Sequence, residues 1–332
     1  MNHLINLINS FPEKEWSFSN LSSNPNIIWE FVIQHPDKPW YNRMLSVNPN
    51  ITWDIIQSNP DYEWDFSRVS GNPNITWDII QKNPAKGWKF GFFSLNPNIT
   101  WDIIKKNLNL DWYWFFISQN ERITMDIVEN NPDIPWDWIY MTKNPNLTWQ
   151  MIQSKPKEIW DWTSLTKHPN ITWDIIKNHP ELPWCYFKLG SNPNITFDIV
   201  EENPNLPWDF ERLSMNPNIT WDIVKKNPDL PWDFKYLSLN PTLTYDIICD
   251  NIDQPWNFES MSSNRFGKHP ILFQRRKIEM EIQSATKIQK RWRRYWYHPY
   301  RWEKDQETKK IFGINRLCER TVSMLNEKSI LW

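Results

Sequence analysis

The stretch NPNITWDII occupies residues 48–56 and recurs at residues 72–80 and 96–104, a step of 24 residues each time. Self-similarity at a fixed period of about 20 to 50 residues is the pattern of solenoids, propellers and arrays. In such proteins each unit contacts only its neighbours. The stretch is therefore a structural building block. The repeat, and not the length of the chain, indicates how the chain is divided into domains.

Two marker positions fix the register of the repeat. A Trp or another large apolar residue stands every 24 residues from Trp29 to Tyr245, and a second Trp recurs without exception from Trp16 to Trp256. Residues 4–8 extend the pattern to the N-terminus. The sequence therefore predicts eleven repeats without an insertion.

The repeat pattern stops after Asn264, where Arg265 takes the place of the expected Pro. Charge changes at the same point, because residues 1–264 carry a net charge of −12 and residues 265–332 a net charge of +10, within a total of −2. We therefore predict two parts, a tryptophan-rich repeat array over residues 1–264 and a basic tail over residues 265–332.

The repeat fits helices better than strands. Ile51, Trp53 and Ile55 alternate with polar residues as in a half-buried strand, but Ile56 breaks the alternation. Prolines cut the chain into segments of a length typical of short helices, and the 6 glycines are few for the tight turns of a β-solenoid. We predict an all-α fold, an α-solenoid of eleven two-helix repeats followed by a basic helical tail. Stacked layers of about 10 Å each would make the solenoid about 100 Å long.

The polar residues that recur in each repeat are of the types that cap the N-terminus of a helix. Thr52 or Asn50 is suited to cap a helix, and Asp54 then falls in the first turn, where its carboxylate meets the positive end of the helix dipole. The recurring acids therefore need no metal. The 25 Trp residues supply enough buried area for short helices to form a continuous core.

Composition excludes several classes of protein. The three Cys residues have neither metal-site nor disulfide spacing, and the sequence has no signal peptide and no apolar run that would cross a membrane. It also lacks a glycine-rich phosphate loop, a nucleophile elbow and a converging set of catalytic residues. We expect a monomeric intracellular protein that is not an enzyme and needs no cofactor.

The middle repeats depart most from the consensus. After the Trp-Asp-Phe segment, two positions that are mostly polar in other repeats become apolar around residues 91–92, 115–116 and 139–140. If they face solvent, they form a patch of the kind that marks partner sites. Alternatively, the loss of two prolines there lets the helices lengthen or tilt and bury the same residues. The candidate partner-binding residues are Phe92, Trp114, Phe115, Phe116, Ile139 and Tyr140.

The tail contains a basic amphipathic segment between residues 271 and 297, in which apolar residues recur at steps of three and four. Part of it, Ile-Gln-Lys-Arg-Trp-Arg at residues 288–293, resembles the first half of an IQ motif, the helical element that binds calmodulin. Basic amphipathic helices also bind nucleic-acid phosphates, membrane surfaces or acidic proteins. The candidate binding residues of the tail are Ile288, Gln289, Arg291, Trp292, Arg293, Arg294 and Trp296.

The NPNITWD and PDLPWDF units at a step of 24 residues, followed by the tail segment ATKIQKRWRR, resemble the uncharacterised tryptophan-rich repeat proteins of giant DNA viruses of amoebae. The repeat is also similar, less closely, to the leucine-rich-repeat variant, a helical solenoid. The first resemblance implies a location in the host-cell cytoplasm or the virion. Neither implies an activity. We expect a non-enzymatic scaffold for protein–protein interaction, with a nucleic-acid-associated protein that binds phosphates through its tail as the alternative.

Overall fold

The computed structural model describes residues 2–155, 159–268 and 286. All secondary structure in these residues is helical, as the sequence predicts. Residues 1–268 form one compact unit, which therefore extends four residues beyond the end of the repeat pattern, and residues 269–332 are assigned to a second unit. The tail residues proposed above to bind partners lie outside the described residues.

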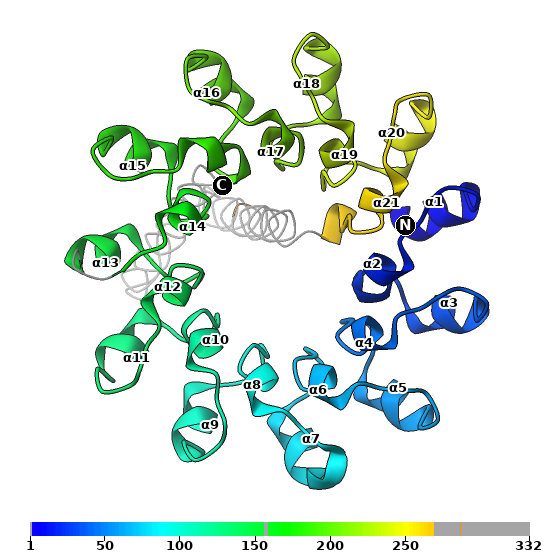
Figure 1. Cartoon of the computed structure of the whole chain (residues 1–332), viewed down its shortest axis with the longest axis vertical. Coiled ribbons are helices and arrows are strands. Elements are labelled where there is room, and N and C mark those ends of the chain that lie inside the picture. The colour runs from blue at the N-terminus through cyan, green and yellow to red at the C-terminus, as the bar shows by residue number, and fades with distance from the viewer. Residues whose placement is uncertain (1, 156–158, 269–285, 287–332) are drawn as a thin grey trace, which may run out of the picture. The chain divides into compact units, whose positions relative to one another are not determined.

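The repeats alternate between an outer and an inner helix (Figure 1). The outer helices are α1 (His3–Ser10), α3 (Trp29–Gln34), α5 (Trp53–Ser58), α7 (Trp77–Lys82), α9 (Trp101–Lys106), α11 (Met125–Glu129), α13 (Trp149–Ser154), α15 (Trp173–Asn178), α16 (Phe197–Glu202), α18 (Trp221–Lys226) and α20 (Tyr245–Asp250). The inner helices are α2 (Phe18–Ser23), α4 (Asn42–Leu45), α6 (Phe66–Val69), α8 (Phe90–Phe93), α10 (Trp114–Ser118), α12 (Trp138–Met141), α14 (Trp162–Thr166), η2 (Tyr186–Ser191), α17 (Phe210–Ser214), α19 (Phe234–Leu237) and α21 (Phe258–Met261). Short 3₁₀ turns lie at η1 (Pro84–Lys86) and η3 (Phe266–Lys268).

The array of repeats closes on itself into a ring. The expected length of about 100 Å therefore describes the stack of repeats and not a distance between its two ends. The outer helices form one circle, the inner helices a second circle within it, and α1 lies beside α20 (Figure 1). Hydrogen bonds join the first and last repeats, among them that from the Ser17 N–H to the Ser262 Oγ at 2.9 Å. Closure gives both terminal repeats the two neighbours that every other repeat has.

Threonine defines where the outer helices start. From α5 to α20 each outer helix begins after a Thr whose hydroxyl accepts a hydrogen bond from a backbone N–H of the first turn, as Thr76 Oγ1 does from Ile79 at 3.3 Å. Of the two predicted caps, Thr is therefore the one used. Asp78 lies in the first turn, as expected from its charge.

The first asparagine of each Asn-Pro-Asn segment connects consecutive repeats. The buried Asn72 side chain donates to the carbonyls of Ser46, Asn48 and Ile51 in the preceding repeat, at 3.0, 3.0 and 3.2 Å. Its Oδ1 accepts from the Asn74 N–H at 2.9 Å, which holds the turn. These bonds satisfy backbone groups that burial between repeats removes from water. We call the series of such residues the asparagine ladder; its members are Asn24, Asn48, Asn72, Asn96, Asn120, Asn144, His168, Asn192, Asn216, Asn240 and Asn264.

The second asparagine, a candidate cap from the sequence, adds to the same connection. Asn74 Nδ2 donates to the carbonyls of Pro49 and Ile51 at 2.8 and 3.0 Å. A Ser or Thr near the end of every inner helix except η2, which has Gly190 at this position, makes a third link. Ser70 Oγ, for example, accepts a hydrogen bond from the Lys89 N–H of the next repeat at 2.9 Å. Every helix is short, so these links between repeats stabilise the fold more than any helix stabilises itself.

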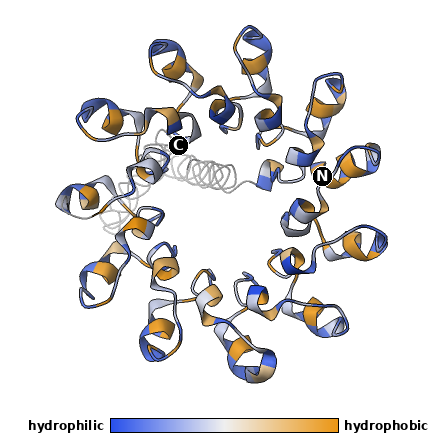
Figure 2. Cartoon of the chain, in the orientation of Figure 1, coloured by the Kyte–Doolittle hydropathy of each residue, from blue (hydrophilic) through white to orange (hydrophobic). Residues whose placement is uncertain are grey.

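The hydrophobic core runs around the ring between its two layers. Apolar residues of the outer helices lie mainly toward the inner helices, and polar residues lie at the outer edge (Figure 2). Aromatic pairs repeat around the core, such as Phe66 against Trp88 with ring centroids 5.6 Å apart. The same edge-on pair forms across the junction of the termini, where Trp16 meets Phe258 at 5.2 Å.

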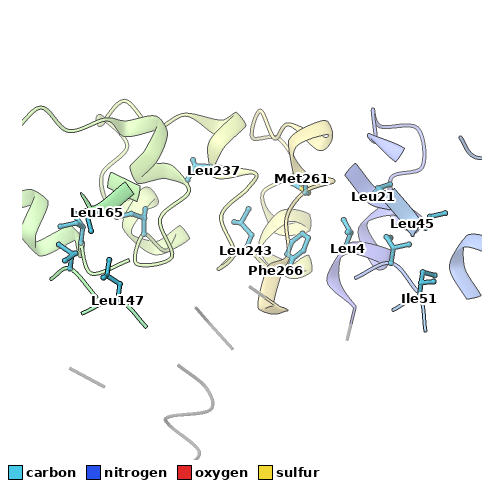
Figure 3. Packing of buried hydrophobic residues seen from close by; sticks show 14 of the residues in the cluster. Leu4, Leu21, Leu45, Ile51, Leu147, Leu165, Leu237, Leu243, Met261 and Phe266 are labelled. Atoms are coloured by element: carbon cyan, nitrogen blue, oxygen red, sulfur yellow. The ribbon is translucent and has the colours of Figure 1, made fainter. Parts of the chain in front are cut away.

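Residues from both ends of the unit fill the core at this junction. Met261 and Phe266 of the last repeat lie next to Leu4 and Leu21 of the first (Figure 3). Each of these side chains is at most 1% exposed. Phe266 belongs to the tail by sequence pattern but to the ring by packing, which is why the compact unit continues to Lys268.

Candidate functional site

The inner helices α8, α10 and α12 present the apolar residues that distinguish the middle repeats. Each helix is about one turn long and buries one side, through Phe93, Ile117 and Met141, all 0% exposed. The two positions after the first helical residue then lie on another side of the turn. The helices are as short as their counterparts elsewhere, so loss of the prolines has not lengthened them.

Five residues from these helices, with the residue that precedes α10, form a surface that we call the aromatic patch. Its members are Phe92, Tyr113, Phe115, Phe116, Ile139 and Tyr140. None of the six belongs to the core or packs against it as part of the core cluster. Ile139 is 47% exposed and Tyr113 44% exposed, and the other four are partly buried.

The rings of the patch pack on one another across two repeats. Phe115 lies 4.3 Å from Phe116 and 5.1 Å from Tyr140 of the next inner helix, measured between ring centroids. Tyr113 stacks on Phe115 at 5.3 Å with an angle of 21° between the rings. Such contacts hold aromatic side chains in a defined arrangement. The patch is thus an ordered surface and not a set of isolated apolar residues.

Gly91 brings α8 into the same surface. A Cβ atom at this position would lie 2.5 Å from the Tyr113 ring. The lack of a side chain at Gly91 therefore lets the ring of Tyr113 rest against the backbone of α8, next to Phe92. The sequence of a single repeat does not predict this contact, because it joins residues of two different repeats.

Sequence reasoning missed Tyr113, although a signal for it exists. Its position precedes the inner helix and is Asp in five repeats, where the carboxylate caps the helix, as Asp137 does by accepting from the Tyr140 N–H at 3.0 Å. Tyr113 and Lys89 occupy the same position before α10 and α8 and make no side-chain cap bond. Replacing a cap costs about 1 kcal/mol. Tyr41 before α4 and Cys185 before η2 also make no cap bond, so a missing cap is not confined to the patch.

Trp114, a candidate from the sequence, belongs to the core side of α10. It packs against the buried cluster and meets Trp136 edge-on at 6.0 Å. Other repeats have Phe or Trp at the same position, such as Phe66 and Trp138, and use it in the same way. Trp114 is therefore a structural residue.

Residues 2–155, 159–268 and 286 contain no group of three or more His, Cys, Asp or Glu side chains that would hold a metal ion. Within the same residues, no helix has both the length and the apolar character needed to cross a bilayer.

His168 takes the place of asparagine in the ladder. Its Nε2 donates to the Asn144 carbonyl at 3.0 Å, and its Nδ1 accepts from the Asn170 N–H at 3.1 Å. The side chain is 5% exposed, and this burial lowers the pKa of the imidazole. With Nε2 donating and Nδ1 accepting, the imidazole has the hydrogen-bonding pattern of its neutral form and copies both the donor and the acceptor of an asparagine amide.

Comparison of the chain with protein-family models, curated proteins and solved structures gave no match.

Proposed function

We propose that this protein is a non-enzymatic interaction scaffold that binds a protein partner through the aromatic patch. The observation that supports this most is the packing of the patch residues on one another, across repeats, outside the core. Contiguous apolar surface of this kind is a frequent feature of partner sites. Aromatic side chains in particular contribute strongly to interfaces.

The departures from the repeat consensus support the same proposal. Residues whose only role is to maintain the ring recur in every unit. The apolar residues of the patch, by contrast, occur in three successive units. In the proposal the protein acts as a monomer, since ring closure leaves no terminal repeat interface open for a second copy.

The test compares proteins captured by the full-length chain with those captured by the double variant Phe115→Ser/Phe116→Ser. A matched control is Phe187→Ser, because Phe187 occupies the position of Phe115 three repeats later and is itself exposed. We expect a partner that is retained by the wild type and by the control and is lost from the double variant. All three proteins should have the same helical circular dichroism.

The tail alternative is separated in the same experiment. Capture is repeated with a truncation to residues 1–268 and with nuclease treatment. A partner retained by residues 1–268 and resistant to nuclease is the expected outcome. Capture that depends on the tail and disappears with nuclease would replace the scaffold with a nucleic-acid-associated protein.

A further inference from the structure

We propose that the partner segment is acidic around an apolar anchor, an inference that rests on the proposed function. Cations border the aromatic patch at both ends. The guanidinium carbon of Arg68 lies 5.0 Å from the centroid of the Phe92 ring, and the Lys143 ammonium lies 4.7 Å from that of Tyr140. Lys89, which precedes α8, is exposed. A segment seated on the patch therefore meets positive charge on each side of its anchor.

None of these three cations is held in an ion pair with a carboxylate within the described residues, although Lys143 interacts electrostatically with Asp161. By contrast, Arg43 on α4 pairs with Asp65 at 3.6 Å, and Arg212 on α17 pairs with Asp209 at 2.8 Å. The cations around the patch are thus available to an external carboxylate.

The positive border is a local feature of an otherwise acidic array. Residues 1–264 carry a net charge of −12, so the surroundings repel acidic molecules in general. The carboxylate nearest in sequence to Tyr140, Asp137, is occupied as the cap of α12. Complementary charge at the rim of an apolar site contributes mainly to the choice of partner and to the association rate.

An acidic peptide fits this surface better than a nucleic acid. Proteins that bind nucleic acids neutralise many phosphates in succession, whereas three cations border the patch and the array as a whole is acidic. Stacking of bases needs free ring faces, but Phe115 and Phe116 cover each other and Tyr140. The ring faces that remain suit aliphatic or aromatic side chains of a peptide.

The spacing of the inner helices sets the length of that peptide. Packed helices lie about 8–10 Å apart, so the three steps from α6 to α12 span about 25–30 Å. An extended chain advances about 3.3 Å per residue. Eight or nine residues therefore reach from Arg68 to Lys143, with the apolar anchor at the centre and acidic residues at both ends.

The experiment is a selection of random 12-residue phage-displayed peptides on the immobilised full-length protein. We expect enrichment of peptides in which Asp and Glu flank an aromatic or aliphatic centre. The affinity of an enriched peptide, measured by fluorescence anisotropy, should fall about tenfold or more in the variant Arg68→Glu/Lys89→Glu/Lys143→Glu. It should also weaken as salt is raised.

Two controls isolate the patch. Lys235→Glu reverses an exposed cation on the inner helix α19, eight repeats after Arg43 and away from the patch, and should leave the affinity unchanged. Because the tail is basic, a peptide that stays bound to both the triple variant and Phe115→Ser/Phe116→Ser is assigned to the tail and does not count as a ligand of the patch. Helical circular dichroism of all variants must match that of the wild type.

The outcomes separate this inference from the proposed function. Peptides that lose affinity in Phe115→Ser/Phe116→Ser but not in the triple variant would overturn the acidic partner and leave the patch as the binding site. Selection of basic or neutral peptides would do the same. No enrichment, or enrichment insensitive to both variants, would overturn both, and tighter binding of a labelled oligothymidine that the triple variant abolishes would assign the cations to nucleic acid.

Discussion

The side-chain amide of Asn24 donates a hydrogen bond to the backbone carbonyl of Asn264, at 2.9 Å, although 240 residues separate them. The same step of one repeat joins Asn72 to the carbonyl of Asn48 at 3.0 Å. The asparagine ladder therefore continues across the junction of the termini with the geometry that it has within the chain. The interaction that joins consecutive repeats is therefore also the one that closes the ring.

Loss of Asn24 should destabilise the protein about as much as loss of an internal member of the ladder. Asn24→Ala removes the donor to the carbonyls of Ser262 and Asn264, and Asn72→Ala removes the donor to three carbonyls. Each buried carbonyl left without a donor costs about 1–3 kcal/mol, so we expect a loss of about 2–4 kcal/mol in both variants. Urea unfolding followed by circular dichroism measures this. In an open solenoid, Asn24→Ala would be nearly neutral.

Truncation at the end of the repeat pattern should be far more damaging than truncation four residues later. Residues 1–268 keep Phe266, which is 1% exposed and packs in the core at the junction, whereas residues 1–264 lose it. Removal of a buried Phe side chain costs about 3–5 kcal/mol. We expect the urea midpoint of residues 1–268 to match that of the full-length chain and that of residues 1–264 to be clearly lower. Equal midpoints for the two truncations would show that Phe266 does not complete the ring.

Much of the local structure follows from the sequence, and closure does not. The 24-residue step, Thr52 as a cap candidate and Asp54 in the first turn were sufficient to place the helices. The Asn-Pro pairs indicated turns, but the carbonyls that Asn72 binds lie in another repeat, so no local rule finds them. Closure depends on a rotation of about 33° for each of eleven repeats. No residue encodes that angle by itself.

One sequence feature was nevertheless consistent with closure. An open solenoid needs terminal repeats with polar outer faces, yet the first repeat begins with Leu4, Leu7 and Ile8, which are all buried.

The aromatic patch could be predicted in part, because Phe115 and Phe116 interrupt polar positions. Tyr113 and the function of Gly91 depend on contact between neighbouring helices, which one repeat considered alone does not reveal.

Acid should weaken the fold at His168. Burial lowers the pKa of this side chain in the folded protein below 6.5, so the unfolded chain binds the proton more tightly. Stability is therefore fully present above a pH of about 6.5, falls as the pH decreases through the window between the two pKa values, and is then constant. Protonation of Nδ1 also removes the acceptor for the Asn170 N–H.

The matched variant is His168→Asn, which restores the residue of the other repeats. We expect the urea midpoint of the wild type to decrease relative to that of His168→Asn between pH 7.5 and pH 5. The other histidines are common to both proteins and cancel in the difference. An identical pH dependence in the two proteins would contradict the assignment of the acid sensitivity to the ladder.

Gly91→Ala should affect the patch more than the fold. Alanine is better than glycine in a helix by about 0.5–1 kcal/mol, but its Cβ would meet the Tyr113 ring at 2.5 Å and displace it. Tyr113 is 44% exposed and can move toward solvent. We therefore expect thermal stability within about 1 kcal/mol of the wild type and weaker binding of a patch-dependent peptide. Unchanged affinity would show that the position of Tyr113 is unimportant for binding.

Closure is measured most directly as a distance across the junction. Spin labels on the exposed positions Ser19 and Lys235 lie at equivalent inner-helix positions two repeats apart around the ring, and labels on Glu211 and Glu259 lie two repeats apart along the chain. Both pairs are introduced into the full-length protein after replacement of its native cysteines with serine. Double electron–electron resonance then gives the two distance distributions.

A closed ring predicts that both pairs have the same narrow distribution, with a mean near 20 Å before the reach of the labels is added, since packed helices lie about 8–10 Å apart. In an open solenoid the pair Ser19 and Lys235 would be separated by nine repeats. The distance would then exceed about 70 Å, while that between Glu211 and Glu259 stayed short. That result would contradict the ring.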